Sequence, residues 1–163
     1  MRLQTKACVF GILLLAIGCA YKSSFSDQLL EQRFCSNQTD FVRLLQMFKE
    51  DSSLSKVTPE AAYLTYDLKA NLPRQRFDDY CAMLSKLNLG SISRSEQTGN
   101  VYFATWNKSD FIVGGSNEYY VYADSAPAEA KYLVDSLNEL RKKTDAYAFK
   151  KIADHWYLHV DNW

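Results

Sequence analysis

Apolar side chains recur at helical spacing in two stretches of the first half of the chain. The stretch 26–50 predicts a helix interrupted near Ser36 and Asn37. A second helix follows Pro73, a residue favoured at helix starts, and Gly90 is placed to end it. The apolar stripes consist of Phe41, Val42, Leu44, Leu45 and Phe48 in the first helix and Phe77, Tyr80, Cys81, Leu84 and Leu87 in the second. The connector, 51–72, predicts irregular structure.

From Ser91 onward the apolar and polar positions alternate as they do in strands. Turn residues, such as those at 98–100 and 107–110, separate the short segments and favour antiparallel neighbours. The candidate strands are 91–95, 101–106, 111–114, 118–123, 146–152 and 156–160. A short helix is predicted over 129–142. The patterns predict an α+β domain over 26–163, with two N-terminal helices packed on an antiparallel meander sheet of about five strands.

The N-terminus has the arrangement of an export signal. Two basic residues, Arg2 and Lys6, precede an apolar run over 7–17. A run of this length is too short to span the roughly 30 Å of a bilayer core as a helix, which disfavours a retained membrane anchor. The sequence therefore predicts an exported protein.

The tetrad Ala16-Ile17-Gly18-Cys19 at the end of this run resembles the lipobox of bacterial lipoproteins, in which a small residue directly precedes a cysteine. The resemblance implies that residues 1–18 are a signal peptide and that Cys19 becomes the lipid-modified first residue. Residues 19–25 would then form a polar tether between the lipid and the domain.

The residues around Cys19 allow two predictions of where the mature protein is located. Because Ala20 is not the aspartate that retains many enterobacterial lipoproteins in the inner membrane, the resemblance favours the outer membrane, with the domain facing the periplasm. The alternative is ordinary signal cleavage after Ala20, which would release a soluble secreted protein.

Charge argues against a nucleic-acid partner. The chain has 19 basic and 19 acidic residues, and removal of Arg2 and Lys6 with the signal leaves 17 basic against 19 acidic, a net charge of −2. The sequence also lacks a run of basic residues that would mark a phosphate-binding face. Since no second long apolar stretch follows the signal, membrane attachment is expected through the lipid on Cys19.

Two of the four cysteines are expected to remain as thiols of the domain. Cys8 would leave with the signal and Cys19 would carry the lipid, so Cys35 and Cys81 are left in an oxidising compartment. An even pair in that setting predicts a disulfide, which would join the two helices. Two buried free thiols, or a reactive thiol, are the alternatives.

Several segments also resemble a family of small uncharacterised bacterial proteins. They are FCSNQTDFVRLLQMFKED, VYFATW, GGSNEYYVYADS, LVDSLNEL and the closing KKIADHWYLHVDNW. The similarity extends over 34–163 and includes a C-terminal motif like Asn-Trp-Tyr-Leu-Tyr, from which His155 and His159 depart. The resemblance implies a helical first half followed by a sheet, and it implies no particular chemistry.

The sequence does not point to catalysis. It lacks a glycine-rich phosphate loop and a serine nucleophile elbow. His155 and His159 share one face of a predicted strand, but four strand residues separate them by roughly 13 Å, too far to hold one metal ion. We therefore assign no catalytic residue, metal or cofactor. A small periplasmic hydrolase acting on cell-wall or lipid material is the alternative function, and it would need polar groups that converge in a cleft.

Tyrosine is the unusual residue, with 11 in the chain. Tyr119, Tyr120 and Tyr122 lie on one predicted strand, and Tyr147 and Tyr157 lie on its expected neighbours. Alternation puts Tyr120 and Tyr122 opposite Tyr119, so that one face should be core and the other exposed. Cross-strand packing explains such tyrosines. The alternative is an exposed aromatic face, with Tyr120, Tyr122 and Tyr157 as candidate binding residues.

These observations predict an envelope-anchored lipoprotein with a binding or structural role, such as that of an immunity or inhibitor protein. Its expected partners are the membrane, through the lipid anchor, and a protein or a glycan. Neither a nucleic acid nor a cofactor is expected.

Overall fold

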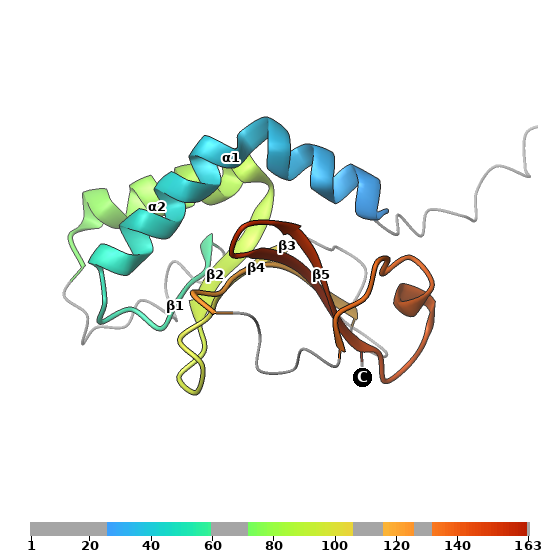
Figure 1. Cartoon of the computed structure of the whole chain (residues 1–163). Helices are drawn as coiled ribbons and strands as arrows, with labels where there is room; N and C mark the ends of the chain where they lie inside the picture. Colours follow the sequence, from blue (N-terminus) through green and yellow to red (C-terminus); the bar gives the residue numbers. More distant parts are fainter. Residues whose placement is uncertain (1–25, 60–71, 106–115, 126–131, 163) are drawn as a thin grey trace, which may run out of the picture.

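The computed structural model describes residues 26–59, 72–105, 116–125 and 132–162 (Figure 1). Two helices lie on one face of a curved six-stranded antiparallel sheet, which confirms the predicted α+β class. The elements are α1 (Asp27–Glu50), β1 (Lys56–Val57), α2 (Arg74–Leu87), β2 (Leu89–Arg94), β3 (Val101–Thr105), β4 (Ser116–Tyr122), the 3-10 helix η3 (Leu140–Lys142), β5 (Tyr147–Ala153) and β6 (Trp156–Asn162).

Helix α1 follows its prediction closely, including the interruption. The Ser26 hydroxyl oxygen accepts a hydrogen bond from the Leu29 N–H and caps the first turn. Asn37 has non-helical backbone angles (φ −126°, ψ 18°), and its side-chain amide donates to the Arg33 carbonyl. The buried residues face the sheet, whereas Val42, which the pattern placed among them, is exposed.

Helix α2 begins directly after Pro73 as predicted but ends before the predicted residue. Asn88 takes the left-handed conformation (φ 53°) and its N–H donates to the carbonyls of Leu84 and Ser85. Asparagine adopts this conformation more readily than most residues because its short polar side chain tolerates it. Gly90, the predicted terminator, lies within β2 instead.

The sheet has six strands rather than about five, in the order β1-β2-β3-β4-β6-β5, so the predicted meander holds from β1 to β4 and is wrong for β5 and β6. After β4 the chain forms β5 at the outer edge and then returns as β6 between β4 and β5. The central position of β6 explains why five successive residues, Trp156–Val160, are all buried. Strand β1 lies in the segment predicted as irregular, and the predicted strand 111–114 lies outside the described residues.

The helix predicted over 129–142 is wrong over its described part, 132–142. Leu137 is buried, but Leu133 is 41% exposed, so these two leucines do not share a helix face. The Val134 N–H donates to the Phe149 carbonyl, which ties the segment to β5. Within 133–142 the chain turns helically only in η3.

Aromatic side chains fill the space between the helices and the sheet. Phe34 and Phe41 of α1 contact Tyr120 and Trp156 at ring-centroid distances between 4.7 and 6.2 Å. Tyr120 is fully buried, and its hydroxyl donates to the Leu30 carbonyl at 3.1 Å. Burial raises the pKa of Tyr120, so this phenol stays neutral. Tyr120 is therefore part of the core.

The structure does not show the predicted disulfide between Cys35 and Cys81. Both are free thiols in the structure; Cys35 is exposed on α1 and Cys81 is half-buried on α2. On α1 the neighbouring Phe34 points into the core, and the next residue of a helix is rotated by about 100° from it. That rotation turns the Cys35 thiol toward solvent.

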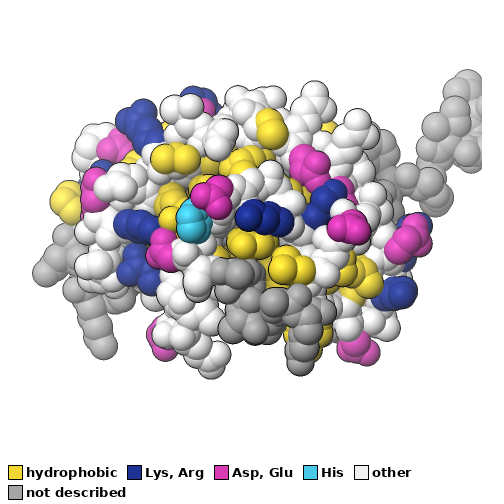
Figure 2. All heavy atoms as spheres, viewed as in Figure 1, with side chains coloured by type: hydrophobic (Ala, Val, Ile, Leu, Met, Phe, Trp, Pro, Cys, Tyr) yellow, Lys and Arg dark blue, Asp and Glu magenta, His cyan; other side chains and the backbone are white. Residues whose placement is uncertain are grey.

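Charged side chains of both signs are interspersed over the face of the molecule shown in Figure 2. Several form exposed pairs, among them Lys49 with Asp124 and Lys142 with Glu139. Such exposed pairs contribute little to stability. This face carries no block of one sign that would steer a strongly charged partner.

Candidate functional site

The face of the sheet turned away from the helices carries a second aromatic cluster. Strand alternation places Tyr102 of β3, Tyr119 of β4, Tyr147 and Phe149 of β5, and His159 of β6 on this open face. The strand register pairs Tyr119 with His159, and His159 with Phe149. The unexpected position of β6 between β4 and β5 therefore brings these rings together.

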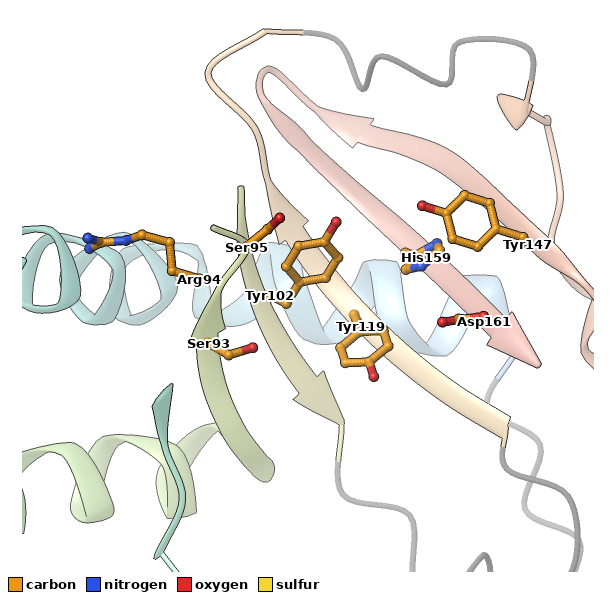
Figure 3. Close-up of a pocket in the computed structure, with 8 residues that line it drawn as sticks. All are labelled: Ser93, Arg94, Ser95, Tyr102, Tyr119, Tyr147, His159 and Asp161. Carbon is orange, nitrogen blue, oxygen red and sulfur yellow. The ribbon is translucent and has the colours of Figure 1, made fainter. Parts of the chain in front are cut away.

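Tyr102, Tyr119 and Tyr147 line an open pocket of about 270 Å³ on this face (Figure 3). We call it the tyrosine pocket. Among the residues that the structure describes, those that line it are Ser93, Arg94, Ser95, Tyr102, Tyr119, Tyr147, His159 and Asp161. The Arg94 side chain is directed away from the other lining residues, and its Nη2 donates to the Phe48 carbonyl at 2.8 Å.

Ring contacts hold the pocket side chains in place. Tyr102 and Tyr119 stand nearly perpendicular (87°) with ring centroids 5.6 Å apart, and Tyr147 meets His159 edge-on at 4.7 Å. His159 stacks on Phe149 at 4.1 Å, with an angle of 12° between the rings. The three tyrosines are half-buried, whereas His159 is 3% exposed, so the tyrosines form the walls and His159 the floor.

A backbone hydrogen bond shows that Nδ1 of His159 carries a hydrogen. Its Nδ1 lies 3.0 Å from the Ala148 carbonyl oxygen, which can only accept, so Nδ1 carries a hydrogen. His155, the other histidine, lies in the β5–β6 turn with a φ of 62°, and its Nδ1 lies 3.1 Å from the Ala123 carbonyl. The two histidines therefore belong to different sites.

Asp161 gives the tyrosine pocket a negative charge. It stands two positions after His159 on β6 and therefore shares its face, paired across the strands with Tyr147 and Asn117. Burial is the largest cause of a raised pKa at Tyr119. The charge of Asp161 and the neighbouring Tyr102 raise this pKa further. Tyr119 therefore stays a neutral phenol, and the pocket combines aromatic rings with one carboxylate.

The predicted binding tyrosines do not line this pocket. Tyr120 lies in the core, and Tyr157, 5% exposed, is buried on the open face against Val121 and Phe149. Tyr122 is half-buried on the helix side, where the Lys49 ammonium lies 4.4 Å from its ring centroid. The prediction of two tyrosine faces holds, but the helices cover the face that was expected to bind.

A second cluster is built from buried charges at the start of α1. Arg141 Nη1 lies 2.5 Å from Asp27 Oδ1 and Arg141 Nε lies 2.6 Å from Glu118 Oε1, with all three side chains at most 7% exposed. Lys150 Nζ lies 3.2 Å from Asp27 Oδ2, and the Leu137 N–H donates to the same oxygen at 2.9 Å. We call this group the buried charge cluster.

The buried charge cluster has a structural role. Burial alone would raise the pKa of Asp27, but hydrogen bonds from Leu137, Arg141 and Lys150 together lower it. Asp27 is therefore ionised at neutral pH and matched by two basic side chains. The cluster ties α1 to a segment 114 positions away in the sequence, which is why no local pattern revealed it.

Comparison of the chain with protein-family models, with curated proteins and with solved structures finds no match. In the part of the chain that the structure describes, no helix is both long and apolar enough to cross a membrane. The same residues contain no group of three His, Cys, Asp or Glu side chains placed to hold a metal ion. The function is therefore inferred from the tyrosine pocket itself.

Proposed function

We propose that this chain is an envelope-anchored bacterial lipoprotein whose domain binds a ligand in the tyrosine pocket. The observation that carries the proposal is the difference between the two sheet faces. Helices cover the face that bears Tyr120, whereas Tyr102, Tyr119 and Tyr147 stay half-buried around an open pocket. Tyrosine supplies rigid apolar area together with a hydroxyl, and it loses little conformational entropy on binding.

The polar groups of the pocket favour binding over hydrolysis. His159 is 3% exposed, stacks on Phe149, and donates its Nδ1–H to a backbone carbonyl. A general base must reach the proton that it removes, and a buried, stacked ring is poorly placed for that task. We therefore assign His159 to the support of the tyrosines.

Lipid attachment at Cys19 is the part of the proposal that rests on the lipobox-like tetrad. Mass spectrometry of the mature protein should find an N-terminal Cys19 carrying acyl chains, because the thiol of a lipobox cysteine receives the lipid. Replacement of this residue, Cys19→Ser, should move the protein from the membrane fraction to the soluble fraction. An unmodified mature chain that starts at Tyr21 would contradict the anchor and favour the secreted alternative.

Ligand binding is tested by NMR of the full chain, labelled with ¹³C-tyrosine, in a polyoxyethylene detergent. The probes are chitotriose as a neutral glycan, choline chloride, and the peptide acetyl-Lys-Lys-Lys-amide. At least one probe should shift the signals of Tyr102, Tyr119 and Tyr147 with a dissociation constant of about 1 mM, or about −4 kcal/mol.

The core tyrosines provide the control in the same spectra. Tyr80 and Tyr120 are fully buried between the helices and the sheet, so their signals should stay unchanged. Pocket signals that fail to move with any of the three probes would contradict the proposed function.

A further inference from the structure

We infer that the tyrosine pocket binds an alkylammonium group, the cationic end of a choline or of a lysine side chain. The inference rests on the proposed function, since it requires the pocket to be a ligand site, and it adds the chemistry of the ligand. Tyr102, Tyr119 and Tyr147 come from three different strands, and together with Asp161 they surround one space (Figure 3).

The angles between the rings suit a compact cation. Tyr102 and Tyr119 stand at 87° to each other, and Tyr147 stands at 74° to His159. The face of an aromatic ring is negative because of its quadrupole, and it attracts a cation within about 6 Å of the ring centroid. An ammonium group in this pocket is expected to contact more than one of these rings, because all three tyrosines line the same space.

The charges around the pocket favour the same ligand. Asp161 contributes a carboxylate to the lining, while two basic side chains of the neighbouring strands, Arg94 and Lys150, are engaged on the helix side of the sheet. The Arg94 guanidinium donates to the Phe48 carbonyl on the helix side. Lys150 of β5 pairs with Asp27 and Glu31, also on the helix side. The pocket therefore presents a carboxylate and aromatic rings, the two groups that attract an ammonium ion.

The size of the pocket separates an ammonium group from the glycan considered earlier. A volume of about 270 Å³ lies just below the range of about 300–1,000 Å³ that is usual for small-molecule sites. A single trimethylammonium or ammonium head group fits such a space better than the several linked rings of an oligosaccharide.

A choline titration against a neutral isostere tests the inference on the wild-type protein. The probe pair is choline chloride and 3,3-dimethylbutan-1-ol, in which a carbon replaces the charged nitrogen at almost the same shape. Choline should shift the signals of Tyr102, Tyr119 and Tyr147 with at least about fivefold tighter binding than the alcohol. Nα-acetyl-lysine methylamide, titrated in parallel, distinguishes a lysine side chain from choline as the preferred source.

A charge variant tests the part played by Asp161. Asp161→Asn should weaken choline binding about fivefold and leave the binding of the alcohol unchanged, as expected for loss of one charge near the ligand. The matched control is Asp79→Asn on the exposed side of α2, which removes the same charge on the other side of the sheet and should leave choline binding unchanged.

The outcomes separate this inference from the proposed function. Equal binding of choline and the alcohol, or pocket shifts with chitotriose alone, would overturn the ammonium ligand and leave the pocket as a binding site. Pocket signals that respond to none of these probes would overturn both. Tighter binding of choline or of the lysine derivative than of the neutral alcohol supports the inference. This comparison uses the wild-type protein and does not depend on the stability of the Asp161 variant.

Discussion

Replacement of Arg141 by methionine should lower the free energy of unfolding by about 3–5 kcal/mol, the usual cost of removing one partner of a buried ion pair. Arg141 is 4% exposed in its side chain and contacts both Asp27 and Glu118. Methionine fills a similar volume but leaves two buried carboxylates without their guanidinium partner. Urea unfolding followed by far-UV circular dichroism measures the loss.

The neighbouring basic residue supplies the control for this prediction. Lys142 pairs with Glu139, and its side chain is 70% exposed, so Lys142→Met should change stability by no more than about 0.5 kcal/mol. A loss below about 1 kcal/mol for Arg141→Met would show that the buried charge cluster does not hold α1 to the sheet.

Acid should weaken the same cluster in the wild-type protein. Asp27 has a lower pKa in the folded than in the unfolded chain, because the hydrogen bonds to its carboxylate outweigh the effect of burial. Its contribution to stability is therefore present above about pH 4 and is lost as the pH falls through the folded value. Without Arg141 this acid-dependent loss should become smaller, which provides a second readout of the same contact.

The two tyrosine faces should respond very differently to truncation. Tyr120→Ala should cost about 3–5 kcal/mol, because it removes a fully buried ring that packs against Phe34 and Phe41. Tyr119→Ala, the adjacent residue on the open face, should cost only about 1 kcal/mol because its ring is half-buried. Thermal and urea unfolding of both variants give the comparison.

The hydroxyl of Tyr120 can be tested separately from its ring. Tyr120→Phe removes the hydrogen bond to the Leu30 carbonyl and should cost about 1 kcal/mol. Equal losses for Tyr119→Ala and Tyr120→Ala would mean that both faces are core, and the open-face pocket would then lose its support.

Local patterns predicted the elements whose stability depends on neighbouring residues. The α1 helix has its predicted bounds because a cap at Ser26 and an apolar stripe are both encoded within a few residues. The interruption at Asn37 was also predicted correctly, because it depends on residues next to it in the sequence. The turn at 98–100 contains Gly99 with a φ of 72°, a conformation that glycine adopts without strain. Each of these features is determined by residues that are close together in the sequence.

The features that were missed depend on contacts between distant residues. Nothing in 146–162 indicates that β6 inserts between β4 and β5, since either strand order satisfies the same alternation. The covered face could not be assigned because alternation separates Tyr119 from Tyr120 without saying which face the helices cover. The tyrosine pocket depends on both facts. Alternation identified the strand correctly, but Tyr120 and Tyr122, which were expected to be exposed, lie on the helix side.

The most direct test of the binding function repeats the NMR titration on two variants, Tyr119→Ser and Tyr122→Ser. Both residues are half-buried tyrosines of β4, but only Tyr119 lines the tyrosine pocket. Thermal melts first establish that both variants are folded. Tyr119→Ser should lose at least about tenfold in affinity for the probe that binds the wild type, and Tyr122→Ser should retain it. Equal affinity of the two variants would mean that the tyrosine pocket is not the binding site.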